Sequence, residues 1–258
     1  MNKKKIFSFV LAAIITFTVI TTPVNASSNV NQSLGVSEVE TIVEINPNAT
    51  IGDNTPLLII GNIPIYKKDV LPDGHLSKKL ENKINEQLEV EVADLTVPST
   101  TIYSTAKASH ESKTYMNISN SNKGKTIFVK GTTSAINFSQ NEEIVYLPKK
   151  AIPKFAATLT KSKNDFLLLI TGLIPKIGPA ISIGSFVNTK YKESHAKQLK
   201  SLYKNGKNAS HAIISSQYAT LRSTAAWNGK TIKAKNYKAS DRSGYKYTVK
   251  SVKYGKKL

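Results

Sequence analysis

The chain contains no cysteine, and this absence excludes several classes of protein at once. Without thiols, the 258-residue sequence offers no disulfide, no thiolate metal site, no iron–sulfur cluster, no cysteine nucleophile and no lipoprotein anchor. Acidic residues are scarce, with 17 against 36 lysines and arginines, so the formal net charge is +19. Hydrophobic residues still make up 40% of the chain, an ordinary share for a folded domain, which argues against wholesale disorder.

Catalytic motifs are also missing. There is no HExxH, no His-x-His, no Gly-x-Ser-x-Gly elbow, no phosphate-binding Walker loop, no dinucleotide fingerprint and no calcium loop. The histidines are His75, His110, His195 and His211. We therefore expect no enzymatic activity, no resident metal and no cofactor.

The first 26 residues have the three parts of a secretory signal peptide. Lysines at positions 3–5 form the positive start, and residues 6–20 form an apolar stretch interrupted by three hydroxyl side chains. Val24-Asn25-Ala26 then places small residues where a signal peptidase cleaves. We expect residues 1–26 to be removed and the protein to be secreted. A retained N-terminal membrane anchor is the alternative.

Charge is divided unequally along the mature chain. Residues 27–150 hold 12 lysines and 14 acidic residues, a net charge of −2. Residues 151–258 hold 19 lysines and two arginines against three acids, a net charge of +18. This segregation indicates that the second half faces a polyanion, although general solubility is the plainer explanation. We expect two domains that meet near residue 150, where Lys149-Lys150 is a candidate site for proteolytic processing.

The type of basic residue narrows the range of partners that the chain is expected to bind. Only Arg222 and Arg242 among the 36 basic residues are arginine. Base-edge recognition and bidentate phosphate binding favour the planar guanidinium, whereas lysine acts as a hydrated point charge. The predominance of lysine therefore predicts a diffuse, salt-sensitive attraction to a polyanion. For an exported protein, anionic lipid and cell-wall polymer are favoured partners over nucleic acid.

The first half is predicted to be mainly β. Residues 38–45 alternate with a period of two, as half-buried strands do. Residues 57–60 and 63–66 form a short apolar ladder, and apolar residues recur every fourth position over 76–88, which is typical of an amphipathic helix. Further strand candidates are residues 113–119, 125–130, 133–138 and 142–147. Residues 27–150 are expected to form a mainly β or α+β domain.

The second half is predicted to be helical first and β at its end. Residues 155–159 and 191–203 have helical spacing, and residues 209–226, rich in small side chains, are a further helix candidate. Residues 231–235 and 245–254 are β-like and are expected to form a basic C-terminal β-hairpin. The expected fold class is α+β, with a mainly β N-terminal part, a central apolar helical hairpin and the C-terminal β-hairpin.

The central apolar segment, residues 166–187, contains a single charge. As one helix it would extend about 33 Å, enough to cross a hydrocarbon core. Pro175 and Pro179 near its middle favour two helices joined by a turn. Three interpretations stay open: a buried helical hairpin in the core of the second domain, a hairpin that enters a bilayer, or a plain transmembrane span.

The bilayer interpretation rests on flanking lysines at positions 161, 163, 190 and 192, which suit anionic head groups. It assigns membrane contact to nine residues of the apolar segment. These candidates are Phe166, Leu168, Ile170, Ile174, Lys176, Ile177, Ile181, Ile183 and Phe186.

Aromatic residues and lysines are interleaved near the C-terminus. Such a pattern suits contact with a polyanion, and equally a sheet whose tyrosines face a core and whose lysines face water. The candidate polyanion-binding residues are Lys230, Lys233, Lys235, Lys238, Lys246, Lys250, Lys253, Tyr245, Tyr247 and Tyr254.

Two functions from different classes follow from these patterns. The first is a secreted, toxin- or bacteriocin-like protein whose apolar hairpin acts on an anionic cell envelope. The alternative is a non-lytic secreted module that binds wall polymer or glycan through its lysines and tyrosines. An enzyme that uses His195 or His211 on such a polymer ranks behind both.

Overall fold

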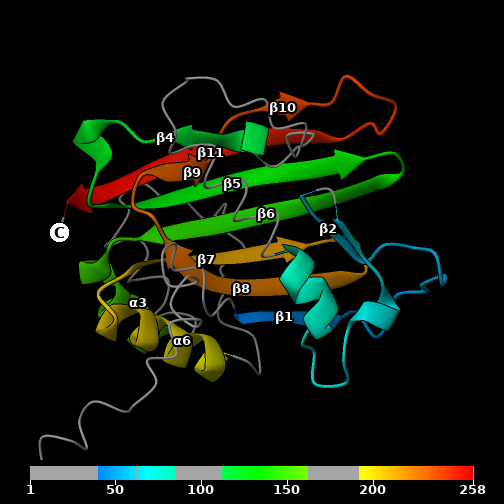
Figure 1. Cartoon of the computed structure of the whole chain (residues 1–258), viewed down its shortest axis with the longest axis horizontal. Coiled ribbons are helices and arrows are strands. Elements are labelled where there is room, and N and C mark those ends of the chain that lie inside the picture. Colours follow the sequence, from blue (N-terminus) through cyan, green and yellow to red (C-terminus); the bar gives the residue numbers. More distant parts are fainter. Residues whose placement is uncertain (1–39, 62, 85–111, 162–191, 258) are drawn as a thin grey trace, which may run out of the picture. The chain divides into compact units, whose positions relative to one another are not determined.

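The computed structural model describes residues 40–61, 63–84, 112–161 and 192–257, and every structural statement below concerns these ranges (Figure 1). The predicted signal peptide and the apolar segment 166–187, with all nine candidate membrane-interacting residues, lie outside them. Within the described ranges, no helix combines the length and the apolar character needed to span a bilayer.

A single antiparallel sheet of seven strands forms the centre of the described structure. Its order is β1-β8-β7-β6-β5-β11-β10, and each neighbouring pair runs antiparallel (Figure 1). The strands are β1 (Glu40–Ile45), β5 (Lys125–Ala135), β6 (Phe138–Leu147), β7 (Asn208–Ser215), β8 (Ala219–Trp227), β10 (Tyr237–Lys238) and β11 (Lys246–Lys257). Strands from both sides of residue 150 share this sheet, and all described residues belong to one compact unit.

The predicted helix over residues 209–226 is wrong. This segment forms the hairpin of β7 and β8, with Ser216 donating through its hydroxyl to the Leu57 carbonyl oxygen at 2.6 Å beside the turn. Both strands are central in the sheet and carry buried residues on both faces, such as Ile213 and Ile214. Buried strands of this kind lack the polar–apolar alternation that marks a half-exposed strand, so small side chains there resemble a helix pattern.

The predicted C-terminal β-hairpin is also wrong, although both of its strands exist. The first, β9 (Thr231–Lys233), pairs with β4 (Tyr115–Asn117) in a separate two-stranded sheet. The second, β11, pairs with β5 on one side and with the short β10 on the other. The expected α+β class is therefore replaced, in the described ranges, by a mainly β fold built on one sheet.

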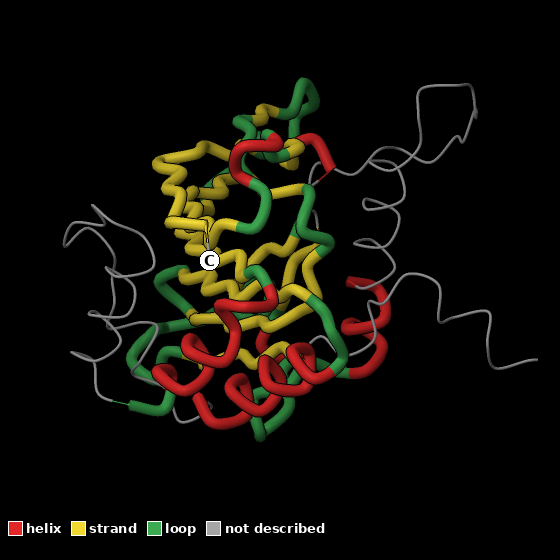
Figure 2. Tube along the Cα trace, turned by 90° about the vertical axis from the view of Figure 1, so that its left-hand side faces the viewer, coloured by secondary structure: helices red, strands yellow, loops and turns green. Residues whose placement is uncertain are grey.

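Two helices cover one face of the sheet, which we call the helix-covered face. They are α3 (Ile152–Leu159) and α6 (Lys192–Lys204), which lie beside each other below β7 and β8 in Figure 1. Phe155 of α3 and Leu199 of α6 are fully buried against Val145 of β6 and Ile213 of β7. Figure 2 shows the helical segments at the periphery of the strands.

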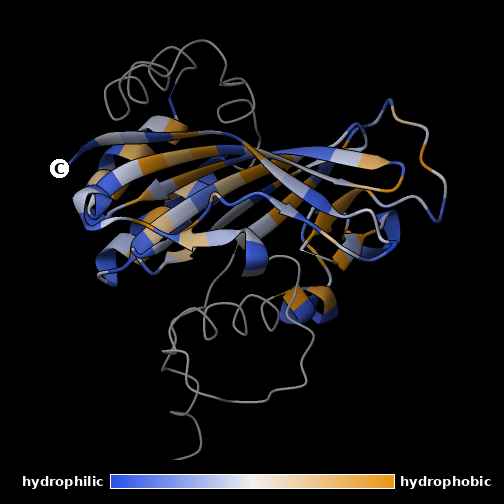
Figure 3. Ribbon diagram, turned by 90° about the horizontal axis from the view of Figure 1, so that it is seen from above, coloured by the Kyte–Doolittle hydropathy of each residue, from blue (hydrophilic) through white to orange (hydrophobic). Residues whose placement is uncertain are grey.

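The opposite, strand-covered face is closed by two separate segments. Strands β2 (Leu58–Ile60) and β3 (Ile63–Ile65), with the helical residues 78–84, pack over β8 and β1 around Leu221 and Val43. Strands β4 and β9 pack over β5 and β6 around Ile127, Tyr146 and Ile232. Figure 3 shows hydrophobic and hydrophilic residues in turn along the long strands. Short 3-10 helices lie at Lys67–Asp69, Ser112–Thr114, Asn120–Asn122 and Lys149–Ala151.

Candidate polyanion-binding surface

The ten predicted polyanion-binding residues do not share one environment. The exposed ones are Lys230, Lys235, Lys238, Lys246 and Lys250. Lys253 and Tyr254 are half-buried, whereas Lys233, Tyr245 and Tyr247 are buried with 4%, 3% and 0% of their surface exposed. The last three contribute to the core of the fold instead of to its surface.

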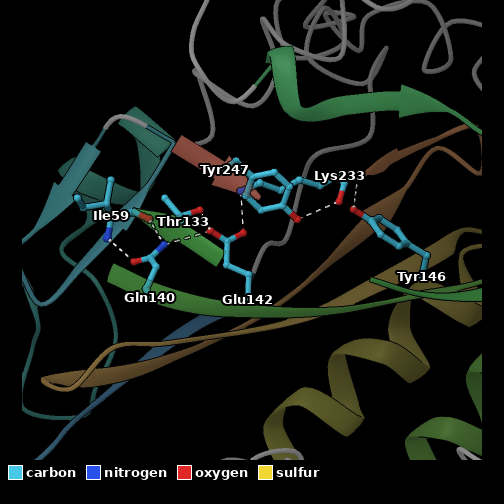
Figure 4. A network of polar contacts seen from close by, with 7 residues as sticks. All are labelled: Ile59, Thr133, Gln140, Glu142, Tyr146, Lys233 and Tyr247. Carbon is cyan, nitrogen blue, oxygen red and sulfur yellow. Dashed lines mark hydrogen bonds and ion pairs between the residues drawn. The ribbon is translucent and has the colours of Figure 1, made fainter. Parts of the chain in front are cut away.

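Lys233 forms a buried ion pair (Figure 4). Its Nζ lies 2.7 Å from Oε2 of Glu142 on β6 and 4.7 Å from the ring centroid of Tyr247 on β11. The side chains of Lys233 and Glu142 are 5% and 1% exposed. Two charges removed from water this completely require mutual pairing and further hydrogen bonds, so this lysine is committed to the interior.

The Glu142 carboxylate accepts further hydrogen bonds from β5 and from its own strand, β6. Its Oε1 accepts hydrogen bonds from the Thr133 hydroxyl and, at 3.2 Å, from Nε2 of Gln140. The Gln140 amide also exchanges two hydrogen bonds with the Ile59 backbone, at 2.6 Å and 2.9 Å (Figure 4). The network therefore links β2, one of the strands that cover the sheet, to the ion pair between Lys233 of β9 and Glu142 of β6.

Two tyrosine hydroxyls bind the backbone of Lys233. The Lys233 N–H donates to the Tyr146 hydroxyl at 2.9 Å, and the Tyr247 hydroxyl donates to the Lys233 carbonyl oxygen at 3.1 Å. These bonds satisfy the backbone N–H and carbonyl oxygen of Lys233. Lys230 and Lys235, on either side of β9, are exposed.

The exposed lysines gather near one edge of the sheet. Residues 228–257 hold nine lysines and Arg242 against one acid, Asp241, and residues 112–125 add three lysines and no acid. We call the exposed lysines of β10, β11 and their neighbours the lysine edge. Its members are these exposed lysines, Lys235, Lys238, Lys246, Lys250, Lys256 and Lys257, and the half-buried Lys125, whose Nζ donates to Oδ1 of Asn122 at 2.9 Å.

The strand register places lysines directly opposite each other at two points. Lys238 of β10 pairs with Lys246 of β11, and Lys125 of β5 pairs with Lys257 of β11. Like charges in directly opposed positions destabilise an antiparallel pair. The register thus concentrates positive charge at two places, and a bound anion would lower the repulsion there.

Local sequence patterns do not predict part of this surface. Lys125, Lys256 and Lys257 were not among the predicted residues, because their proximity depends on the pairing of β5 with β11. Lys250 was predicted, and it occupies the register shift between Val249 and Ser251, where the strand bulges and the lysine is exposed. A basic C-terminal composition was the available signal, and it does not specify which strands meet.

A second polar cluster lies between helix α6 and the helix-covered face of the sheet. His195 of α6 and His211 of β7 each place Nδ1 against the Thr224 hydroxyl of β8, at 3.0 Å and 2.9 Å. The hydroxyl has one hydrogen, so it donates to one ring and accepts from the other, and the two imidazoles are opposite tautomers. Their ring centroids are 5.2 Å apart.

Both imidazoles are neutral at neutral pH. Burial, assisted by the nearby Arg222 guanidinium, lowers the pKa of His195 to about 4. Burial and the charge of His195 lower the pKa of His211 well below its usual value. Arg222, itself 3% exposed, lies 3.9 Å from Oε2 of Glu44. Within the described ranges, no three histidine or acidic side chains are grouped as metal ligands would be.

No family model matches the chain, and no curated protein or solved structure matches it.

Proposed function

We propose that the protein is an exported binding module that adheres to an anionic polymer of the cell envelope through its lysine edge. The observation that carries the proposal is the strand register, which places Lys238 opposite Lys246 and Lys125 opposite Lys257. A fold that serves only solubility gains nothing from placing like charges directly opposite each other, since dispersed lysines repel less.

The chemistry of the surface favours a polymer over a small anion. Lysine side chains are hydrated point charges without the fork geometry of arginine, and Arg242 is the single arginine of residues 228–257. Their attraction accumulates with the number of phosphates or carboxylates in contact. The partner is therefore a repeating polyanion, and its recognition depends on charge density.

The apolar segment 166–187 remains the basis of the sequence prediction of membrane activity, and the described residues add no argument to it. The lysine edge alone supports adhesion. The experiment for the proposal therefore includes a membrane readout, so that the two functions give different results.

The test measures retention of the full chain on a purified anionic wall polymer against the same polymer stripped of its anionic groups. We expect retention on the first, none on the second, and elution by salt. Lys238→Gln with Lys246→Gln should reduce the slope of log affinity against log salt by about 1.4, since each lost contact is worth about 0.7.

The matched control is Lys78→Gln with Lys79→Gln, which removes the same charge from two exposed lysines of the 78–84 helix. An equal loss of polymer binding in both double variants would show that only net charge matters. It would refute the assignment of binding to the lysine edge. Release of dye from anionic vesicles without retention on the polymer would favour the membrane-active function instead.

A further inference from the structure

The two lysine pairs lie at opposite ends of one long strand. Lys246 is the first residue of β11 and Lys257 is the last. At about 3.3 Å per residue, eleven steps separate them by about 36 Å, and the two register shifts in β11 shorten this somewhat. A small anion that neutralises one pair therefore cannot reach the other.

The pairs also project from opposite faces of the sheet. Lys246 is opposite Ser134 on β5, and Lys257 is opposite Lys125 on the same strand. Ser134 and Lys125 are an odd number of residues apart, and alternate residues of a strand point to opposite faces. The Lys238–Lys246 pair belongs to the helix-covered face and the Lys125–Lys257 pair to the strand-covered face.

The edge of β11 offers a route between the two faces. Among the described strands, β10 pairs with β11 only at Lys246 and Tyr247. Past the Val249 amide, which donates to Asn236, the exposed Lys250 and Lys256 follow along the strand. Lys250 occupies the bulge, where a strand bends and its extra residue is left unpaired. Positive charge thus continues from the first pair to the second.

We infer that the ligand is a long, flexible, linear phosphate polymer that passes over the edge of β11 and contacts both lysine pairs at once. This inference rests on the proposed function and narrows it. Flexibility is required because the polymer must turn from one face to the other within about 36 Å. Duplex DNA has a persistence length of about 150 base pairs, so it can meet one pair but not follow this path.

Length matters for the same reason. Each lysine pair alone is a weak site, and a chain that occupies one pair holds its next segment near the other. Linking two weak sites in this way raises affinity by about 10²–10⁴ without any new contact. The preference for long chains is therefore a property of the two pairs acting together.

The experiment measures binding of the full chain to linear inorganic polyphosphate of about three and about one hundred phosphates, at one salt concentration. We expect the long chain to bind at least 100-fold more tightly per molecule. Lys238→Gln with Lys246→Gln, or Lys125→Gln with Lys257→Gln, should each remove most of that advantage. The control pair, Lys78→Gln with Lys79→Gln, should preserve it.

The outcomes separate this inference from the proposed function. Salt-sensitive binding that is equal per phosphate for both chain lengths, or that depends on one lysine pair only, would overturn the spanning mode and leave polyanion adhesion standing. Tighter binding to a duplex DNA of about 30 base pairs than to long polyphosphate at equal phosphate concentration would also overturn it. Absence of binding to every polyanion would overturn the proposed function itself.

Discussion

Lys233→Met isolates the energetic role of the buried ion pair. The substitution introduces an apolar side chain of similar length. It removes the ammonium that lies 2.7 Å from Glu142 and 4.7 Å from the Tyr247 ring centroid. Glu142, whose side chain is 1% exposed, then keeps only its hydrogen bonds from Thr133 and Gln140. An uncompensated buried charge of this kind costs about 3–5 kcal/mol of folding free energy.

The structure explains why the effect should come from the side chain alone. The hydrogen bonds of Lys233 with Tyr146 and Tyr247 use its backbone, and the substitution preserves them. Glu142→Gln combined with Lys233→Met should recover part of the loss, because a neutral amide oxygen can still accept from Thr133 without leaving a charge unpaired. The double variant is therefore expected to be more stable than Lys233→Met.

Urea unfolding followed by fluorescence measures these differences. Trp227 is the single tryptophan and is 8% exposed within the core beneath β9, so its emission reports on the region concerned. Lys235→Met is the matched control, since this exposed lysine lies two residues further along and should change stability by less than about 0.5 kcal/mol. Equal losses in Lys233→Met and Lys235→Met would refute the assignment of Lys233 to the interior.

Three further predictions concern the core and its titration. Unfolded histidine titrates near 6.5, whereas the folded pKa of His195 is about 4, so the unfolded chain gains protons first and stability falls by about 3 kcal/mol between pH 7 and pH 4. His211 acts in the same direction, and urea unfolding across this range should show a flatter profile for His195→Gln. Gly131→Ala would place a methyl group 2.6 Å from Cζ of the buried Tyr247 and should cost about 1–3 kcal/mol by the same measurement. Phe155→Ala should lower stability by about 3–5 kcal/mol, seen as a lower midpoint of thermal unfolding.

Local patterns predicted a strand and a helix that the structure contains. The period-two alternation over residues 38–45 corresponds to β1, whose residues 41 to 43 are buried while those at its end are partly exposed. The helical spacing around His195 and Leu199 corresponds to α6, which turns those two residues to the sheet. In α6 one side meets the core and the other meets water, which is the condition for periodicity to be informative. In β1 the consecutive residues 41 to 43 are all buried, so its alternation in sequence does not correspond to one wet and one dry side.

Local patterns did not predict which strands pair across long distances in the sequence. The strand over residues 231–233 was expected to join residues 245–254, yet its partner is β4, more than a hundred residues earlier in the chain. Residues 120–124, rich in Asn, Ser and Gly, have the composition of a hairpin loop, yet they lead from β4 in one sheet to β5 in the other. Short strands carry too few residues to specify a partner, so their register is decided by what they cover.

The candidate site shows the same limit at the level of single residues. Lys233 and Lys235 have the same side chain, are two positions apart and belong to the same basic segment, yet one is buried against Glu142 and the other is exposed. The difference comes from β6, which supplies Glu142 and Tyr146 from about ninety residues upstream. Composition identified the region as basic, and only the packing distinguishes its structural lysine from its surface lysines.

The arrangement of the lysine edge also determines which substitutions are informative. Ordering a lysine side chain costs up to about 2 kcal/mol of conformational entropy, so a diffuse surface gains most when each ammonium stays mobile near several phosphates. Loss of one lysine is then compensated by its neighbours on the same strand. Loss of an opposed pair removes the local excess of charge together with the repulsion that a ligand would relieve. Substitution of both Lys238 and Lys246 should therefore lower the affinity for the ligand and slightly raise the stability of the unliganded protein. A lysine pair that serves ligand binding predicts these two opposite changes.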